Sequence, residues 1–336
     1  MKFLIIPAVR MKSGTGIRLY GIADALRKMG HKVEIADTRK QKFFSDADVV
    51  FASKSLIGSC IPSLFRKAFT NSLLILDIDD LEWGYWKNSP LKYPMMFSDK
   101  FFPKYFDFVT THTKPLENYI VKELGIKRDR IIFLPQGIDF SMFEKVKWKP
   151  TKPKRIVYAA HLGVAAKDVD IILKVFKRVV AKEKNVRLQI IGSGQYLQHF
   201  KDMAKEMGIG GSVDFLGYVK HENIPGIIAK ASVAVNYLRD TQANRYRSSI
   251  KVREYLTIGI PTVCNIIGDI SIFSKYVYGF KTGDLEDFEN KILKALKNPN
   301  KQMLVRGRKY IRENWDWSKV TVDFEKKVRK ICGKTM

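Results

Sequence analysis

The chain has 336 residues, 46% of them hydrophobic and 12% aromatic, which is enough material for two cores and excludes a disordered or fibrous protein. Its 60 lysines and arginines exceed its 34 aspartates and glutamates, and the resulting charge of +26 attracts polyanions such as nucleic acid, anionic lipid or a phosphorylated substrate. Cys60, Cys264 and Cys332 show no spacing typical of a zinc site or a disulfide framework, so we expect a reducing, cytoplasmic location.

The first apolar run, 2–7, is interpreted as a buried strand rather than a signal peptide, because Pro7 and Arg10 interrupt it and no small-residue cleavage site follows. No run approaches the roughly 18 uncharged apolar residues of a spanning helix. We therefore expect any membrane contact to be peripheral, at the inner face of the cell membrane. In the first half of the chain we expect strands at 2–7, 32–36, 49–52, 73–77, 108–111 and 131–134, and helices at 17–29, 63–69 and 115–124.

The segment 143–155 lacks a hydrophobic period and carries Pro150 and Pro153, so we interpret it as an interdomain linker. A second alternating series follows, with strands expected at 156–159, 187–191, 213–216, 233–237 and 262–265, and helices at 169–181, 196–207, 223–230, 250–258, 301–313 and 318–331.

This alternation predicts an α/β fold of two doubly wound, Rossmann-like domains that face a central cleft. The first domain is expected at 1–148 and the second at 149–316, with 317–336 a helix that packs back on the first domain. Ligands of such sheets bind at the carboxyl ends of the strands, so we look for chemistry in the loops after the strands.

Two glycine-bearing loops follow predicted strands. The first ends in Gly14 and Gly16 directly before a helix, where backbone N–H groups and the helix dipole favour an anion. The second, 191–194, has two glycines but lacks the third glycine of a dinucleotide fingerprint, so we interpret it as a tight turn.

The loop and helix at 240–261 gather positive charge. They place four cations around the amino end of a helix that starts near Ser248 or Ser249: Arg245, Arg247, Lys251 and Arg253. Cations are unfavourable at that end of a helix unless an anion such as a diphosphate bridges them. The alternative is a generally basic surface on which Lys251 pairs with Glu254.

Four segments identify a protein family only when they are taken together, through their order and spacing in the chain. They are Met29-Gly30-His31-Lys32-Val33, Leu134-Pro135-Gln136-Gly137-Ile138-Asp139, Val213-Asp214-Phe215-Leu216-Gly217-Tyr218-Val219 and the run from Ser249 to Pro261. Together they resemble glycosyltransferase family 4, a group of retaining enzymes with the GT-B fold, over nearly the whole chain. The resemblance implies that a hexosyl or related group moves from a nucleotide-diphosphate sugar, a co-substrate, without a metal or other cofactor.

The resemblance also implies donor-binding roles. Glu254 would bind the ribose hydroxyls, and the backbone amides of Ser249 and Ile250 would face the diphosphate. The remaining implied donor contacts are Lys167 and Lys251 on the diphosphate, His161 where the family has an arginine, Tyr218 on the base, and Tyr246 where the family has the first of two glutamates.

Asp77, Asp79 and Asp80 end a predicted strand, and three acids this close repel one another unless a cation, a proton or hydroxyl donors compensate them. The resemblance places Asp79 or Asp80 against the transferred sugar, and we expect both to be catalytic, with Lys167 and Lys251. Helix capping and loop hydrogen bonds are the alternative. An Asp-x-Asp pair is the metal site of a different transferase fold, GT-A. The resemblance here is to GT-B enzymes, which generally need no metal for the transfer, so no metal is expected.

The segment 91–106 mixes aromatic residues with lysines, which suits docking on an anionic lipid surface or holding a lipid-linked acceptor, with ordinary core as the alternative. The sequence thus predicts a glycosyltransferase of glycan biosynthesis that acts on a carbohydrate or lipid-linked acceptor. The alternatives are a nucleotide-sugar epimerase of the same fold and a non-catalytic protein that binds sugar nucleotides or polyanions. No nucleic-acid partner is expected, since no helix-turn-helix, zinc or RNA-recognition motif occurs.

Overall fold

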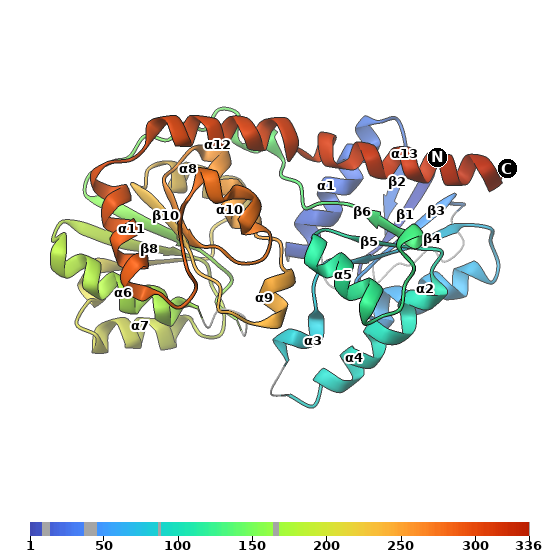
Figure 1. The fold of residues 1–336 in the computed structure, drawn as a ribbon, viewed down its shortest axis with the longest axis horizontal. Coiled ribbons are helices and arrows are strands. Elements are labelled where there is room, and N and C mark those ends of the chain that lie inside the picture. Colours follow the sequence, from blue (N-terminus) through green and yellow to red (C-terminus); the bar gives the residue numbers. More distant parts are fainter. Residues whose placement is uncertain (9–13, 37–45, 87–88, 164–167, 336) are drawn as a thin grey trace. The chain divides into compact units, whose positions relative to one another are not determined.

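The computed structural model describes residues 1–8, 14–36, 46–86, 89–163 and 168–335. They form two compact units, each built on one parallel sheet (Figure 1). Unit 1 contains Met1–Ile138, Tyr246–Ser248 and Asn314–Met336, and unit 2 contains Asp139–Arg245 and Ser249–Glu313. The first boundary thus follows Ile138, earlier than the expected 148, and the segment from Asn314 onward belongs with the amino-terminal residues.

Unit 1 has a six-stranded sheet in the order β2-β1-β3-β4-β5-β6. Its strands are β1 (Lys2–Ile6), β2 (Lys32–Ile35), β3 (Val49–Ser53), β4 (Leu73–Ile78), β5 (Phe108–Thr111) and β6 (Ile131–Phe133). Its helices are α1 (Gly14–Lys28), α2 (Ile57–Lys67), α3 (Glu82–Tyr85), α4 (Lys92–Phe101), α5 (Lys114–Lys122) and α13 (Trp317–Thr335). Every residue of β3 is buried, as expected for a central strand covered by helices on both faces of a parallel sheet.

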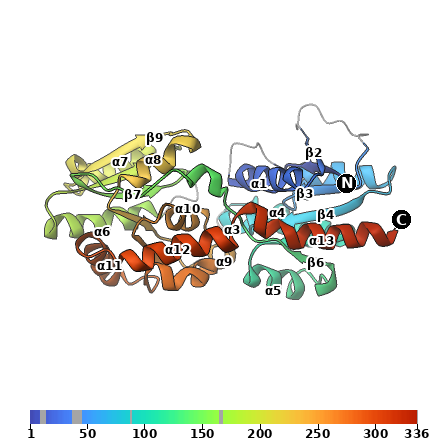
Figure 2. The ribbon, with the colours of Figure 1, turned by 90° about the horizontal axis from the view of Figure 1, so that it is seen from above.

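Helix α13 packs along α1, and the two lie side by side in both views (Figures 1 and 2). The indole of Trp317 lies against Gly21 and Gly137, where a side chain at either glycine would collide with the ring. His31 follows the helix stop at Gly30, which has a φ of 86°, and its Nε2 lies 2.9 Å from Oε1 of Glu325 on α13. The first helix thus ends where Gly30 adopts a left-handed conformation.

Unit 2 has a six-stranded sheet in the order β12-β11-β10-β7-β8-β9. Its strands are β7 (Lys154–Ala159), β8 (Val186–Ile191), β9 (Val213–Gly217), β10 (Val233–Asn236), β11 (Thr262–Asn265) and β12 (Tyr278–Phe280). Its helices are α6 (Val169–Lys182), α7 (Leu197–Glu206), α8 (Ile224–Ala229), α9 (Gln242–Tyr246), α10 (Ile250–Ile258), α11 (Leu285–Lys297) and α12 (Lys301–Asn314). The last residues of α9 and α12 belong to unit 1. Short 3-10 turns lie at Phe102–Tyr105, Arg128–Arg130, Phe140–Phe143, Gly210–Ser212, His221–Asn223 and Gly268–Tyr276.

Both sheets are wound in two directions from an inner strand. In unit 1 the winding reverses between β1 and β3, and in unit 2 it reverses between β7 and β10. Right-handed crossovers from such a start place helices on both faces of a sheet. The predicted α/β class and double winding are confirmed, and the carboxyl ends of these strands become the places to search for a site.

Within the described part of the chain, no helix combines the length and the apolar character needed to cross a membrane.

Candidate functional site

A group of buried charges lies where β3 and β4 end in unit 1. Lys54 directly follows β3 and has a φ of 59°, a left-handed conformation that residues other than glycine rarely adopt. Its buried ammonium contacts the Glu82 carboxylate and lies 3.3 Å from Oδ1 of Asp79. Backbone strain of this kind concentrates at functional positions. Lys54 was not predicted as a site residue, although its place directly after a strand is a signal that could have identified it.

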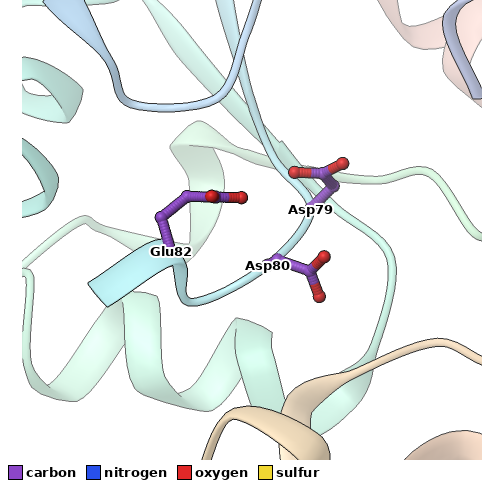
Figure 3. A group of neighbouring side chains, drawn as sticks. All are labelled: Asp79, Asp80 and Glu82. Carbon is purple, nitrogen blue, oxygen red and sulfur yellow. The ribbon is translucent and has the colours of Figure 1, made fainter. Parts of the chain in front are cut away.

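Three carboxylates meet beside this lysine. Asp79 and Asp80 lie on the loop after β4, and Glu82 begins α3 and points toward Asp79 (Figure 3). One oxygen from each lies within 4.8 Å of the others, an arrangement that could hold a cation. Lys54 already supplies a positive charge to Asp79 and Glu82. The sequence therefore identified two of the three carboxylates as site residues but not the ammonium that compensates them.

Proton binding in this group falls near neutral pH. Burial, followed by the charge of Asp79, raises the pKa of Asp80 to about 7. Burial, followed by the charge of Glu82, raises the pKa of Asp99 on α4 to about 8, and Oδ2 of Asp99 has no hydrogen-bond partner within the described residues. Burial opposes the charge on Lys54, but Asp79 and Glu82 hold its pKa well above the ordinary value. Carboxyl groups in both protonation states are thus available to sugar hydroxyls.

The glycines of the first loop lie elsewhere than predicted. Helix α1 begins at Gly14, so Gly14 and Gly16 form its first turn, and the expectation that both precede the helix is wrong. They still lie at a helix amino end, where backbone N–H groups lack intrahelical partners. The remainder of that loop, residues 9–13, lies outside the described residues.

In unit 2, α10 brings two predicted donor contacts to the end of β7. The N–H of Ala159, the last residue of β7, lies 3.2 Å from the Tyr255 hydroxyl, which fixes α10 beside this strand end. Nζ of Lys251 lies 3.4 Å from the Tyr158 hydroxyl and 4.6 Å from the centroid of its ring. Lys251 therefore lies near a strand at which the winding of the sheet reverses.

Glu254 is buried on α10 and is paired with a histidine. Its Oε1 lies 3.0 Å from Nε2 of His221, which belongs to the segment after β9. The hydrogen bond to Glu254 raises the pKa of His221. This pairing differs from the alternative we considered for Glu254, a contact with Lys251. His221 was not identified from the sequence, although it is a polar residue shortly after a predicted strand.

The amino end of α10 is held by an internal ion pair. The Arg253 guanidinium is buried, 2.5 Å from Oδ2 of Asp269, and lies over the Phe273 ring at 4.9 Å. The expectation that Arg253 faces an anion from solution is wrong, because its charge is compensated inside the unit. The N–H of Ser249 donates to Oδ1 of Asp269 at 3.2 Å, so a ligand phosphate would have to share or replace this acceptor. Ile250 begins the helix directly after Ser249.

The loops after β7, β8 and β9 are joined to one another. The N–H of Gly192 donates to the Gly217 carbonyl at 2.8 Å, and that of Leu162 donates to the Ser193 carbonyl at 2.9 Å. A side chain at position 192 would collide with the Ala160 carbonyl oxygen. Residues 191–194 were expected to form a tight turn, but Ile191 ends β8 and Gly192 forms a bridge to Gly217. Close approach of these backbones explains why glycine is needed there.

Two other predicted residues lie at the ends of this loop cluster. His161 is exposed directly beyond β7, and Tyr218 is exposed directly beyond Gly217, where its ring can stack on a base. Lys167 lies outside the described residues.

An ion pair that was not predicted from the sequence joins the segment after β10 to the first turn of α6. The Arg239 guanidinium donates to both oxygens of Asp170 at 2.6 and 2.7 Å, and its backbone N–H donates to Oδ1 of Asp168 at 3.2 Å. Arg239 follows the Val233–Asn236 strand, so the same strand-end rule would have found it.

Tyr246 belongs to unit 1. Its ring packs against Tyr119, with centroids 5.5 Å apart, and against the core under the unit 1 sheet. Its carbonyl accepts a hydrogen bond from the Thr113 hydroxyl at 2.8 Å. Packing alone therefore accounts for a tyrosine here, and its predicted contact with a donor remains a prediction.

Comparison with known proteins gives a consistent result. A family model described as glycosyl transferases group 1 matches residues 140–313. The chain is 24% identical over 190 residues to mannosylfructose-phosphate synthase of Agrobacterium fabrum, an alignment that covers 52% of this chain but only 40% of that protein.

Solved structures share the fold over the full length. Sucrose-phosphate synthase from Thermosynechococcus elongatus is 12% identical, with 99% of each chain covered and a TM-score of 0.79. HepE from Anabaena, solved with UDP and glucose, is 12% identical, with 98% of this chain and 99% of that chain covered and a TM-score of 0.74.

Proposed function

Since the chain belongs to the glycosyl transferases group 1 family, we propose that it moves a sugar from a nucleotide-diphosphate donor to a carbohydrate acceptor. One observation carries this proposal: α10, inside the matched region, presents Lys251 beside Tyr158 near the carboxyl end of β7 and buried Glu254 beside His221 after β9. A fixed carboxylate suits the two hydroxyls of a ribose, and an ammonium suits a diphosphate.

In the proposed reaction the bond between the anomeric carbon and the diphosphate oxygen breaks, and a bond to an acceptor hydroxyl oxygen forms. The acceptor's proton passes to the departing diphosphate or to solvent, so atoms and charge balance. Negative charge that accumulates on the diphosphate would be stabilised by Lys251, Lys167 and the amino end of α10. His161, Tyr218, Ser249 and Ile250 keep their proposed roles as further donor contacts, as do Gly14 and Gly16 at the start of α1.

We also propose that the anomeric configuration is retained, as the sequence resemblance implies, and that transfer needs no metal. Lys54 supports the second point because it places a positive charge beside Asp79 and Glu82. Undiminished turnover after treatment with EDTA would agree with it, and loss of turnover that magnesium restores would contradict it.

UDP is the first nucleotide to test, because the similar HepE structures were solved with UDP and with UDP-glucose. A carbohydrate acceptor is supported by the names of the similar proteins, synthases of mannosylfructose phosphate and sucrose phosphate. Hydroxyls of the transferred or accepting sugar would bind the carboxylates of Asp79 and Asp80. A lipid-linked acceptor and a cytoplasmic location remain parts of this proposal.

The decisive experiment has two steps. A thermal-shift screen of nucleoside diphosphates and nucleotide sugars identifies a donor, because a ligand that binds only the folded state raises Tm. The identified donor is then incubated with and without an acceptor panel, and release of nucleoside diphosphate is measured. Acceptor-dependent release would support the proposal. Conversion of the donor without any acceptor would identify an epimerase instead, and the absence of any nucleotide that shifts Tm would overturn the site.

A further inference from the structure

Helix α2 carries its large apolar side chains on the outside. Its exposed residues recur every fourth position and are between 50% and 69% exposed: Ile57, Ile61, Phe65 and, just beyond the helix, Phe69. Its buried residues are Ser59, Cys60, Ser63 and Arg66. A surface helix in water normally has the opposite arrangement, with its apolar stripe toward the core.

The α4 segment shows the same inversion. Its exposed aromatic residues again recur every fourth position and are between 39% and 72% exposed: Tyr93, Phe97, Phe101 and Tyr105. Within α4 the buried residues are Ser98 and Asp99, and in the 3-10 turn that follows they are Phe102 and Pro103. The rings of Phe97 and Phe101 stack with centroids 5.3 Å apart, and the ring of Tyr105 lies 4.9 Å from that of Phe101.

The two helices are joined by a reciprocal pair of hydrogen bonds. The Ser55 hydroxyl donates to the Ser98 carbonyl at 2.9 Å, and the Ser98 hydroxyl donates to the Ser55 carbonyl at 2.5 Å. Ser55 lies directly before α2, and Ser98 lies within α4. We call the eight exposed residues of 57–69 and 93–105 the α2/α4 apolar surface.

Positive charge accompanies this surface. Lys100 and Lys104 are exposed within the α4 segment. Residues 57–69 contain no acid, and the acid within 92–105 is Asp99, which is buried. Each helix therefore presents apolar side chains, and the α4 segment adds cations without an exposed carboxylate.

We propose that the α2/α4 apolar surface docks on an anionic lipid bilayer. Large apolar side chains on one helix face with lysines beside them are typical of helices that lie in the membrane interface. In this arrangement the Phe and Ile side chains enter the boundary between headgroups and acyl chains, while Lys100 and Lys104 lie at the lipid phosphates. A second copy of the chain is a poorer occupant, because a symmetric contact would bring these lysines against their own counterparts.

The proposal goes beyond glycosyl transfer and does not depend on it, since the surface can bind lipid without donor or acceptor. Sedimentation with phosphatidylcholine vesicles, with and without phosphatidylglycerol, measures the binding directly. We expect binding to the anionic vesicles that weakens as salt is added.

Variants separate the apolar and the charged contributions. Phe65→Ser and Phe97→Ser should each weaken binding to anionic vesicles about tenfold. Val305→Ser is the matched control, because Val305 is 69% exposed on α12 of unit 2, and it should leave binding unchanged. Lys100→Gln and Lys104→Gln should each cost about fivefold on anionic vesicles, whereas Lys201→Gln on α7 should not. Tm and far-UV circular dichroism confirm that each variant is folded.

Wild-type protein that does not sediment with anionic vesicles would overturn the proposal. So would folded Phe65→Ser and Phe97→Ser variants that bind as the wild type does. Dimers that both variants abolish, without vesicle binding, would assign the surface to self-association instead. Failure of the transfer assay leaves this vesicle result unaffected, so the two proposals fail separately.

Discussion

Nε2 of His221 and Oε1 of Glu254 lie 3.0 Å apart, so a residue from the segment after β9 and a residue of α10 form one pair, which is charged when His221 is protonated. The pair holds the Glu254 carboxylate in a fixed place, because the hydrogen bond restricts a side chain that is already buried. His221 is thus a positioning residue for the carboxylate that we propose binds the ribose.

We expect Glu254→Gln to weaken binding of the donor nucleotide about tenfold or more, because a hydrogen bond to a charged acceptor contributes about 1.5–3 kcal/mol. Isothermal titration calorimetry with UDP measures the change. Glu286→Gln on the exposed side of α11 is the matched control and should bind normally. An unchanged Kd for Glu254→Gln would remove this residue from the site.

The charged pair also predicts how stability depends on pH. The folded-state pKa of His221 is raised above its ordinary value, so the pair stabilises the fold fully below that ordinary value and loses its contribution as pH rises through the folded pKa. The His221 side chain is 39% exposed, so we expect the difference between wild type and His221→Asn to be only about 0.5 kcal/mol at low pH.

Urea unfolding at about pH 5.5 and about pH 8.5 brackets this titration. The difference should disappear at the higher pH, and His199→Asn on the exposed side of α7 should show none at either pH. A difference that grows with pH would contradict the assigned pairing.

Asp99 also makes the stability of the fold depend on pH, but here removing the titrating group should stabilise the protein. Its folded-state pKa is raised to about 8, far above that of an unfolded aspartate, so the wild type loses stability as pH rises from about 4 to about 8. Asp99→Asn removes this loss and should be more stable than the wild type by about 1–3 kcal/mol above pH 8, and equal to it in acid. Free energies of unfolding across this range test it, with Asp129→Asn, an exposed position in unit 1, as the control.

Lys54→Met should be strongly destabilising. The substitution keeps most of the side-chain volume but leaves the Asp79 and Glu82 carboxylates without their ammonium, which costs about 3–5 kcal/mol for a buried pair. Lys122→Met at the exposed end of α5 should change the free energy of unfolding by less than about 0.5 kcal/mol. If both variants were equally stable, Lys54 would not be the compensating charge.

The strands were the most predictable part of the fold. The bounds of β5 (Phe108–Thr111) and β11 (Thr262–Asn265) agree with the prediction residue for residue, because short apolar runs between turns have few other interpretations. β12 was missed, since three residues at a sheet edge give too short a pattern.

The helices that differ have identifiable causes. α2 begins at Ile57, but its start was predicted at 63. Pro62 lies inside the helix, and a proline more often marks a helix boundary. α4 was not predicted as a helix. Its exposed face carries aromatic residues and its buried residues are polar, which is the reverse of the pattern by which a surface helix is usually identified. α11 has a signal that could have found it: Asp284 accepts the N–H of Asp287 at 2.9 Å as an amino-terminal cap.

Within the site, the motif around α10 located Lys251 and Glu254, but helix geometry should have excluded Arg253 from the same face. Residues two positions apart on a helix point in nearly opposite directions, so Lys251 and Arg253 could not both face one ligand. The place of Lys54 after a strand could have marked it as a candidate, but its pairing with Asp79 and Glu82 depends on tertiary contacts between segments that are separate in the sequence. Asp99 could not be predicted for the same reason.

The seating of Trp317 against Gly21 and Gly137 has a consequence for biosynthesis. Most of unit 1 is translated before unit 2, yet unit 1 is completed by a helix that is translated only after unit 2. While the ribosome makes the intervening residues, the groove for the Trp317 indole stays open to solvent. Unit 1 therefore stays incompletely folded while unit 2 is translated. During that interval its exposed apolar surface is prone to aggregation and is a target for chaperones.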